Sequence, residues 1–300
     1  MYPIIFQYNN FIISSYGFML MLAFLVCNYL LKQHLIKINE DENHADNIIF
    51  YAALGGIVGS KLYFIFERVI FDQDYTNIYG FINIFKGLFL LDFSLALNGI
   101  NEFGSGRVFL GGLIGGMLSV TYYIRKNNLK WLIVADWVAP YLILGHAIGR
   151  IGCFLVGDCY GKPTNLPWKC SFVNGLPPTT YNSFKFNYPN IFNNENFQSL
   201  YKYNDIIYVH PTQIYEFLIY ILIFYYLISI RSKNTINGLV MFEYLFLAGI
   251  SRFIIEFLRL NPKYIFGLTG AQIISLIMVF SGSYLMYAFN SKYGKLNGKS

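Results

Sequence analysis

Charged residues are scarce in this 300-residue sequence: Asp, Glu, Lys and Arg make up 13% of it, whereas hydrophobic residues make up 55%. Soluble domains usually carry about a quarter charged residues. A chain of this composition cannot cover itself with enough polar surface to stay in water, so the sequence predicts a membrane protein. The net charge of +6 is not gathered into a basic patch interleaved with aromatic residues, so we expect no nucleic-acid partner.

Cysteine is also rare, and its spacing matters more than its number. The four cysteines lack the paired short spacing of a zinc site, so the sequence predicts no metal centre. A disulfide between Cys159 and Cys170 is open, since it depends on an oxidising compartment. The N-terminus has no basic region and no small-residue cleavage site, so the first apolar run is expected to be retained and not removed as a signal peptide.

Long apolar runs dominate the rest of the chain. A membrane-spanning helix needs about 20 mostly apolar residues. The segment 81–97 is interrupted by Lys86 and Asp92, and we interpret it as an interfacial or re-entrant piece. We therefore predict an all-α integral membrane protein with seven transmembrane helices, at about 10–31, 48–69, 106–124, 131–156, 214–230, 236–257 and 268–289.

The short basic loops predict the orientation of these helices, because Lys and Arg gather on the cytoplasmic side. With seven helices the N-terminus is outside and the C-terminus is cytoplasmic. The domains are then residues 1–156, with helices one to four and the outer segment near 81–97; residues 157–212, a small extracytoplasmic head between helices four and five; and residues 213–300, with helices five to seven and a basic tail. The basic residues lie at Lys32, Lys37, Arg125, Lys126, Lys130, Arg231, Lys233, Lys292, Lys295 and Lys299.

The stretch HAIGRIGCFLVGDCYG, residues 146–161, places charge at the end of an apolar helix. His146 and Arg150 are four residues apart and share a helix face, and Asp158 adds a carboxylate beyond them. One interpretation is an arginine that reaches the membrane interface as an anchor. The other is a binding site, because the surrounding glycines allow a ligand to approach closely.

A second motif, GRVFLGGLIGG at residues 106–116, carries the GxxxG spacing in Gly111–Gly115 and Gly112–Gly116. Such glycines usually let two membrane helices pack closely. They could equally form a slot for the glycerol and phosphate of a lipid. Residues 55–60 repeat the spacing in another predicted helix.

Two further motifs place charge at predicted helix ends. HPTQIYEFL, residues 210–218, has the proline of a helix start, but a capped start does not account for His210. In SRFIIEFLRL, residues 251–260, Arg252 and Glu256 are four residues apart. This pair is either a structural ion pair or part of a functional site. Arg150 and Arg252 could converge on one phosphate, because guanidinium groups bind two of its oxygens at once.

Together these motifs resemble those of the bacterial prolipoprotein diacylglyceryl transferase family. The resemblance covers YGFMLML, GGLIGG, GRIGCFLVGDCYG, HPTQIYE, RFIIEFLR and GLTGAQIISLIM, in this order along the chain. It implies an enzyme of the bacterial cytoplasmic (inner) membrane that moves a diacylglyceryl group from phosphatidylglycerol to the lipobox cysteine of prolipoprotein signal peptides. The product is a thioether, glycerol phosphate is released, and no cofactor is expected.

The resemblance also implies roles for individual residues. Arg150 matches an arginine that holds the headgroup, and Arg252 and Glu256 match the late Arg and Glu, with Asp158 where the family usually has Glu. The sequence departs from the family at Leu110, where a His or Tyr is usual, and at Cys153, where Asn is usual. His146 and His210 are therefore candidates for the base. The residues expected to bind phosphatidylglycerol are Arg150, Arg252, Gly111, Gly112, Gly115 and Tyr16.

Two other functions compete with this interpretation. The departures at Leu110 and Cys153 favour a divergent paralogue with another lipid donor or acceptor. A small-solute transporter or a non-catalytic lipid-binding membrane protein is the other alternative. Transporters often show paired halves with interrupted helices, and the sequence has no such halves.

Overall fold

The computed structural model describes residues 2–8, 11–104, 108–192, 202, 205–232 and 236–297. The predicted helix 106–124, the predicted head and the basic tail therefore fall partly outside the described residues, as do Lys233 and Lys299. The chain forms two compact units, Met1–Ile38 with Leu132–Ser300 and Asn39–Trp131, and each is described by itself. The first unit holds β1 (Ile4–Tyr8), β2 (Phe11–Ser14), α1 (Ser15–Lys37), α6 (Trp131–Val156, apart from its first residue), α7 (Tyr181–Asn187), α8 (Pro189–Phe192), α10 (Thr212–Arg231), α11 (Leu239–Glu256), η1 (Ile265–Gly267) and α12 (Gly270–Asn297); the second holds α2 (Asn43–Phe71), α3 (Thr76–Phe89), α4 (Phe93–Gly104) and α5 (Phe109–Lys126).

Five helices among the described residues are long and apolar enough to cross a membrane: α1, α2, α6, α10 and the part Gly270–Ser291 of α12. The protein is therefore a multi-pass membrane protein, as the composition predicts. The other two predicted spans correspond to α5 and α11, which have 18 residues each. At 1.5 Å per residue each is about 27 Å long, close to the hydrocarbon thickness of about 30 Å. Because α5 is rich in glycine and α11 carries three charged residues, seven spans stay a prediction.

The N-terminus differs from the sequence prediction of a helix from residue 10. Strands β1 and β2 form an antiparallel hairpin before α1 begins at Ser15. Alternating Ile and Phe around two asparagines suit a hairpin better than a helix. The Ser14 hydroxyl then accepts a hydrogen bond from the backbone N–H of Gly17 at 3.1 Å and caps α1.

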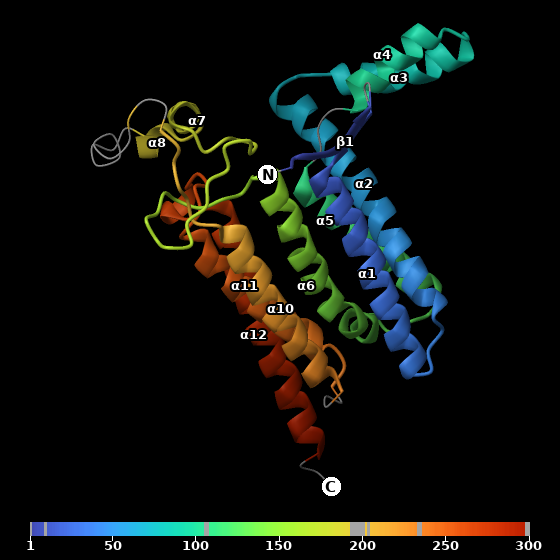
Figure 1. Cartoon of the computed structure of the whole chain (residues 1–300). Helices are drawn as coiled ribbons and strands as arrows, with labels where there is room; N and C mark the ends of the chain where they lie inside the picture. Colours follow the sequence, from blue (N-terminus) through green and yellow to red (C-terminus); the bar gives the residue numbers. More distant parts are fainter. Residues whose placement is uncertain are drawn as a thin grey trace. The chain divides into compact units, whose positions relative to one another are not determined.

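The segment near 81–97 folds as parts of two helices, α3 and α4, that lie side by side as a hairpin (Figure 1). The Asp92 carboxylate accepts a hydrogen bond from the N–H of Leu95 at 3.1 Å, which starts α4. With 14 and 12 residues, the helices are about 21 and 18 Å long, too short to cross the hydrocarbon core. Their interfacial location stays a prediction.

Helices α2 and α5 of the second unit pack through their glycines. A Cβ added at Gly59 would lie 2.7 Å from the Cα of Gly115, and it would also collide with the carbonyl oxygen of Gly111. Gly55 and Gly115 meet in the same backbone-to-backbone way. The two GxxxG faces therefore pack against each other, which is the packing role that the sequence left open.

Gly59→Ala is expected to destabilise this unit by about 1 to 3 kcal/mol, because the added methyl group has no room between the two backbones. Thermal unfolding of the detergent-solubilised protein measures the effect. Gly104→Ala is the matched control, since a Cβ at Gly104 meets no atom of the described residues within 4 Å. Equal thermal unfolding midpoints for Gly59→Ala and Gly104→Ala would show that α2 and α5 leave room for a methyl group at Gly59.

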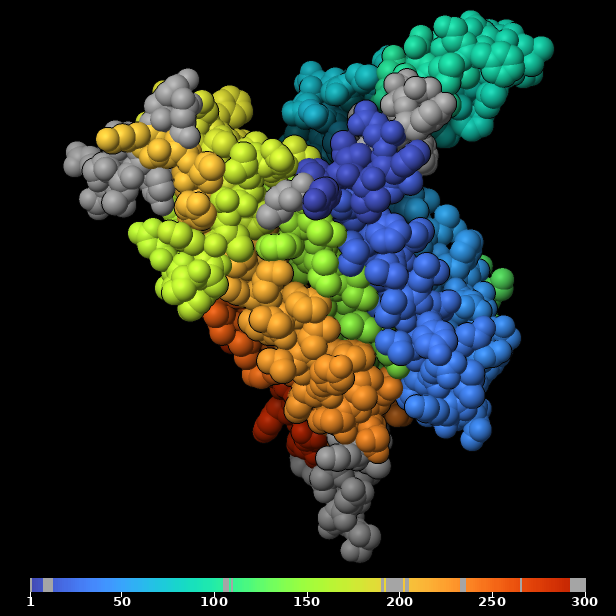
Figure 2. Space-filling view, viewed as in Figure 1, coloured from blue at the N-terminus to red at the C-terminus, as the bar shows by residue number. Residues whose placement is uncertain are grey.

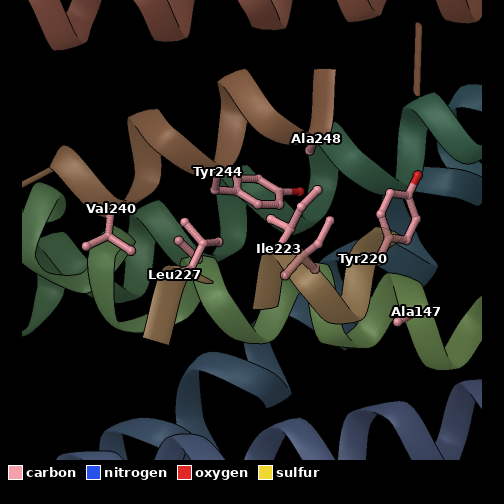
Figure 3. Close-up of a cluster of buried hydrophobic side chains, with 9 residues drawn as sticks. Ala147, Tyr220, Ile223, Leu227, Val240, Tyr244 and Ala248 are labelled. Carbon is pink, nitrogen blue, oxygen red and sulfur yellow. The ribbon is translucent and has the colours of Figure 1, made fainter. Parts of the chain in front are cut away.

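The first unit has its own core between α6, α10 and α11, which lie next to one another (Figure 1). Figure 3 shows Tyr220, Ile223 and Leu227 of α10 in this core, with Tyr244 of α11 opposite them. Tyr220 is one helical turn from Glu216, so this core supports the polar end of the bundle. Its buried residues are Ala139, Ile143, Ala147, Tyr220, Ile223, Leu227, Val240, Tyr244 and Ala248.

Asp136 of α6 caps the start of α11. Its carboxylate accepts hydrogen bonds from the backbone N–H groups of Gly238 at 2.6 Å and Met241 at 2.9 Å. Asp136→Ala is expected to cost about 0.5 to 2 kcal/mol of stability, because both donors lose their acceptor. Asp136→Asn, which keeps one oxygen, should lose less. A smaller loss of stability for Asp136→Ala than for Asp136→Asn in thermal unfolding would contradict this capping role.

Figure 2 shows that α10, the orange helix, is uncovered on this face of the molecule. Leu218, Leu222 and Tyr225 on this helix are each more than half exposed. Exposed apolar side chains around long helices are what the hydrocarbon part of a bilayer requires.

Residues 157–211 link α6 to α10 and form a small subdomain with its own core. The described part holds short helices and isolated antiparallel bridges, such as Cys170 with Val209. All four cysteines are free thiols, so the possible Cys159–Cys170 disulfide is not formed. The Cys170 thiol instead donates to the carbonyl oxygen of Trp168 at 3.7 Å. The buried core residues are Tyr160, Phe172, Phe184, Phe192, Ile207 and Val209.

Candidate anion-binding site

Three helices of the first unit bring their charged residues together at the end of the bundle where α6 continues into the subdomain. Glu216 of α10 accepts from Nε of Arg150 on α6 at 2.7 Å and from a terminal nitrogen of Arg252 on α11 at 2.5 Å. The structure thus joins two arginines, far apart in sequence, through one carboxylate. Arg150 and Arg252 converge, as the sequence predicts.

Glu256 is the second carboxylate of this group. Arg252 reaches it at 2.8 Å, and the side chains of Asn261 and Thr269 donate to its other oxygen at 2.6 and 2.9 Å. Arg259 lies 3.8 Å from both Glu216 and Glu256. We call the five charged residues Arg150, Glu216, Arg252, Glu256 and Arg259 the ion-pair network.

The network carries an excess of positive charge. Three arginines face two glutamates, and guanidinium groups stay protonated in proteins. Both carboxylates and Arg259 are buried, with the Glu216 side chain 1% exposed, while the side chains of Arg150 and Arg252 are 20% and 21% exposed. The donors that remain accessible are therefore cationic, which suits an anionic ligand.

Backbone contacts fix α10 against the end of α6. The Thr212 hydroxyl donates to the carbonyl oxygen of Cys159 at 2.8 Å, and the Gln213 amide donates to that of Asp158 at 2.5 Å. The N–H of Lys162 donates to the carbonyl oxygen of Leu258 at 2.7 Å, which joins the same segment to the end of α11. These bonds explain why Thr and Gln occur in the HPTQIYE motif.

The turn after α6 gathers a second group of reactive side chains. The thiols of Cys153 and Cys159 and a carboxylate oxygen of Asp158 all lie within 4.8 Å of one another. Arg150 approaches the Cys153 sulfur at 3.9 Å. Gly157 has a φ of 74° and Cys159 one of 57°, so the chain turns back on itself through left-handed conformations.

Burial and neighbours change the acidity of this turn. Burial raises the pKa of Asp158 to about 7, so a share of this carboxyl is protonated at neutral pH. A hydrogen bond from Cys153 and the guanidinium of Arg259 lower the pKa of the Cys159 thiol. In the ion pairs of the described residues, Asp158 is not joined to the ion-pair network.

Tyr16 is brought to this region as expected. A Cβ added at Gly152 would lie 3.3 Å from the Tyr16 ring, so α1 approaches α6 next to Arg150. His146 instead contacts the ring of Tyr220, with centroids 6.2 Å apart, and is exposed on α6. His210 faces the Tyr215 hydroxyl at 3.3 Å. In the contacts of the described residues, neither histidine joins the ion-pair network, and their role as a base stays a prediction.

The glycines assigned to lipid binding lie in the second unit. Gly111 and Gly115 are covered by α2, and Gly112 would place a Cβ 3.2 Å from the carbonyl oxygen of Gly56. Packing therefore accounts for these positions. A contribution of Gly111, Gly112 and Gly115 to phosphatidylglycerol binding stays a prediction.

Sequence reasoning missed two members of the site. Glu216, which binds the two partly accessible arginines, and Arg259 are not among the site residues that the sequence predicts. A usable signal was present for Glu216. An ionisable residue in an apolar helix long enough to span a membrane marks a functional site by default.

An apolar helical bundle with a partly accessible, net cationic network at one end defines a multi-pass membrane protein built to bind an anion. The sequence model of the prolipoprotein diacylglyceryl transferase family matches residues 3–288. A phosphatidylglycerol–prolipoprotein diacylglyceryl transferase of Clostridium tetani is 32% identical over 292 residues, 97% of each chain. Its counterpart in Finegoldia magna is 29% identical over 96% of this chain and 95% of its own, and that of Aliivibrio salmonicida is 26% identical over 95% and 86%. The chain belongs to the prolipoprotein diacylglyceryl transferase family.

Proposed function

We propose that this protein transfers a diacylglyceryl group from phosphatidylglycerol to the lipobox cysteine of a prolipoprotein. The observation that carries the proposal is the ion-pair network. Its three arginines exceed its two carboxylates by one positive charge, and one phosphodiester of phosphatidylglycerol carries one negative charge. Family membership and the activity named for its relatives support the same donor and acceptor.

In this proposal Arg150 and Arg252 bind the phosphate directly. Both are partly accessible and both are held in place by Glu216. The acceptor thiol loses its proton, its sulfur forms a bond with carbon three of the glyceryl unit, and the bond from that carbon to the phosphate oxygen breaks. The electron pair leaves with glycerol phosphate. Arginines fixed beforehand around the leaving group stabilise its growing charge most where water is excluded.

Glu216 and Glu256 are positioning residues in this proposal. Both are buried, and each binds a different terminal nitrogen of Arg252 through one carboxylate oxygen. Asn261 and Thr269 hold Glu256 in turn. Such support fixes the donors before the substrate arrives. Asp158, His146 and His210 remain candidates for the group that accepts the thiol proton.

We place the protein in the bacterial cytoplasmic membrane with the N-terminus outside and the C-terminus in the cytoplasm. The distribution of basic residues supports this orientation. Residues 157–212 then form an extracytoplasmic head, and the ion-pair network lies at the outer leaflet. Cysteine accessibility labelling of intact cells, with single cysteines at residue 166 and at residue 128, tests the orientation.

A complementation experiment tests the function. The gene is expressed in a bacterium depleted of its own transferase, and lipoprotein maturation is followed by mass spectrometry of one lipoprotein. Modification of the lipobox cysteine by a diacylglyceryl group is the expected result. Purified protein with labelled phosphatidylglycerol and a lipobox peptide gives the same answer without the host. Labelled product from another phospholipid, and none from phosphatidylglycerol, would favour the divergent paralogue instead.

A further inference from the structure

We propose that Cys153, Asp158 and Cys159 form a binding site for a thiophilic divalent cation of the Zn²⁺ class. This site goes beyond the proposed transfer reaction, and an Asp158 carboxylate that binds the cation leaves His146 and His210 as the candidates for the base. The sequence argued against a metal centre because the cysteines are not paired at short spacing. The structure places two thiols and a carboxylate together nevertheless, since the chain reverses direction after α6.

The geometry is close to that of a bound metal. Around a tetrahedral Zn²⁺ with Zn–S distances of about 2.3 Å and Zn–O distances of about 2.0 Å, ligand atoms lie about 3.5 to 3.8 Å apart. The three ligand atoms here are within 4.8 Å of one another, so they need to approach by about 1.3 Å at most. A flexible carboxylate and two thiols can do this by side-chain rotation.

The backbone of the turn supports a built site. Cys159 occupies the left-handed region with a φ of 57°, which costs a residue with a Cβ free energy and persists only where its surroundings require it. This conformation returns the Cys159 thiol to the end of α6, beside Cys153. Gly157 makes the turn possible with a φ of 74°, and a Cβ at that position would lie 2.8 Å from the Cα of Gly175.

Asp158 supplies an independent observation. Its Oδ1 atom is buried and has no hydrogen-bond partner among the described residues. A buried carboxylate oxygen without a donor is costly, and native structures usually satisfy it with a partner, water or an ion. The same residue contributes the oxygen ligand of the cluster. A cation bound to the Asp158 carboxylate would give this buried oxygen a partner.

The neighbouring arginines are compatible with a metal–thiolate group. Both sulfurs bind Zn²⁺ as thiolates. The Cys153 sulfur lies 3.9 Å from the guanidinium of Arg150, which favours its thiolate form. Three protein ligands leave the fourth tetrahedral position for a molecule from outside the chain, such as water or a soluble thiol.

Cobalt substitution tests the site directly. The full-length protein is purified in detergent, reduced with a phosphine, stripped with a chelator and titrated with Co²⁺. We expect one Co²⁺ per chain with a sulfur-to-cobalt charge-transfer band, displaced by Zn²⁺. Cys153→Ser and Cys159→Ser should each lose the band, and Asp158→Asn should weaken binding. Cys170→Ser and Cys27→Ser are matched controls that keep the band.

Several results would overturn the proposal. One is the absence of a charge-transfer band in protein whose thiols are shown to be reduced. Another is a band that survives both Cys153→Ser and Cys159→Ser. A third is a Cys153–Cys159 disulfide that forms in metal-free protein and persists in cells, seen by peptide mapping without reductant. Because the readout is metal binding, a failed transferase assay would not affect the outcome.

Discussion

Replacement of Arg150 by lysine is expected to lower the rate of diacylglyceryl transfer by about 100- to 1,000-fold, the usual loss when one preorganised donor to a developing oxyanion is removed. Lysine keeps the positive charge and can still reach Glu216. It lacks the planar fork that holds two phosphate oxygens at once. The effect should therefore appear mainly in kcat, because the leaving phosphate gains its charge only in the transition state.

The measurement is transfer from labelled phosphatidylglycerol in mixed micelles to a lipobox peptide, with kcat and KM determined separately. Arg231→Lys is the matched control. Arg231 ends α10 and contacts the Tyr141 hydroxyl at 3.3 Å. The control should keep its activity within about twofold, since Arg231 lies at the opposite end of α10 from Glu216 and the ion-pair network. A kcat equal to that of the wild type in Arg150→Lys would show that Arg150 does not bind the phosphate in the transition state.

The fold was predictable to the extent that hydrophobic length decides it. Runs of about 20 apolar residues predict helices in a membrane without knowledge of their neighbours. The pairing of strands β1 and β2 was not predicted, because their Ile and Phe residues suit a strand and a membrane helix equally well by hydropathy. The pairing of α2 with α5 could not be predicted either, since the GxxxG spacing does not indicate which other helix packs against it.

The sequence predicted the arginines of the candidate site more completely than its carboxylates. Arg150 and Arg252 stand out because a charge in an apolar helix is rare. The convergence of Glu216 on both depends on the packing of α10 between α6 and α11, which no local pattern encodes. The cluster of Cys153, Asp158 and Cys159 depends on a left-handed cysteine, a conformation that the residue type argues against.

Replacement of Glu216 by glutamine is expected to have the largest effect on both stability and transfer. The variant leaves Arg150 and Arg252 without their shared counter-ion in a buried position. Loss of one partner of a buried ion pair costs about 3 to 5 kcal/mol. The thermal midpoint should fall accordingly, and transfer should drop by at least about 100-fold because the two donors are no longer held in place. Glu243→Gln is the matched control, since Glu243 of α11 makes a single exposed bond with the Tyr226 hydroxyl at 3.0 Å.

A double variant separates positioning from simple stability. In Arg150→Gln with Glu216→Gln, one unpaired charge disappears together with its partner, so the midpoint should recover part of the loss seen for Glu216→Gln alone. Transfer should not recover in the double variant, because Arg150, which binds the phosphate, has been replaced. Recovery of both quantities together would mean that Glu216 acts only through the stability of the bundle. Recovery of stability alone, with phosphatidylglycerol binding retained through Arg252, is the result that the geometry of the ion-pair network predicts.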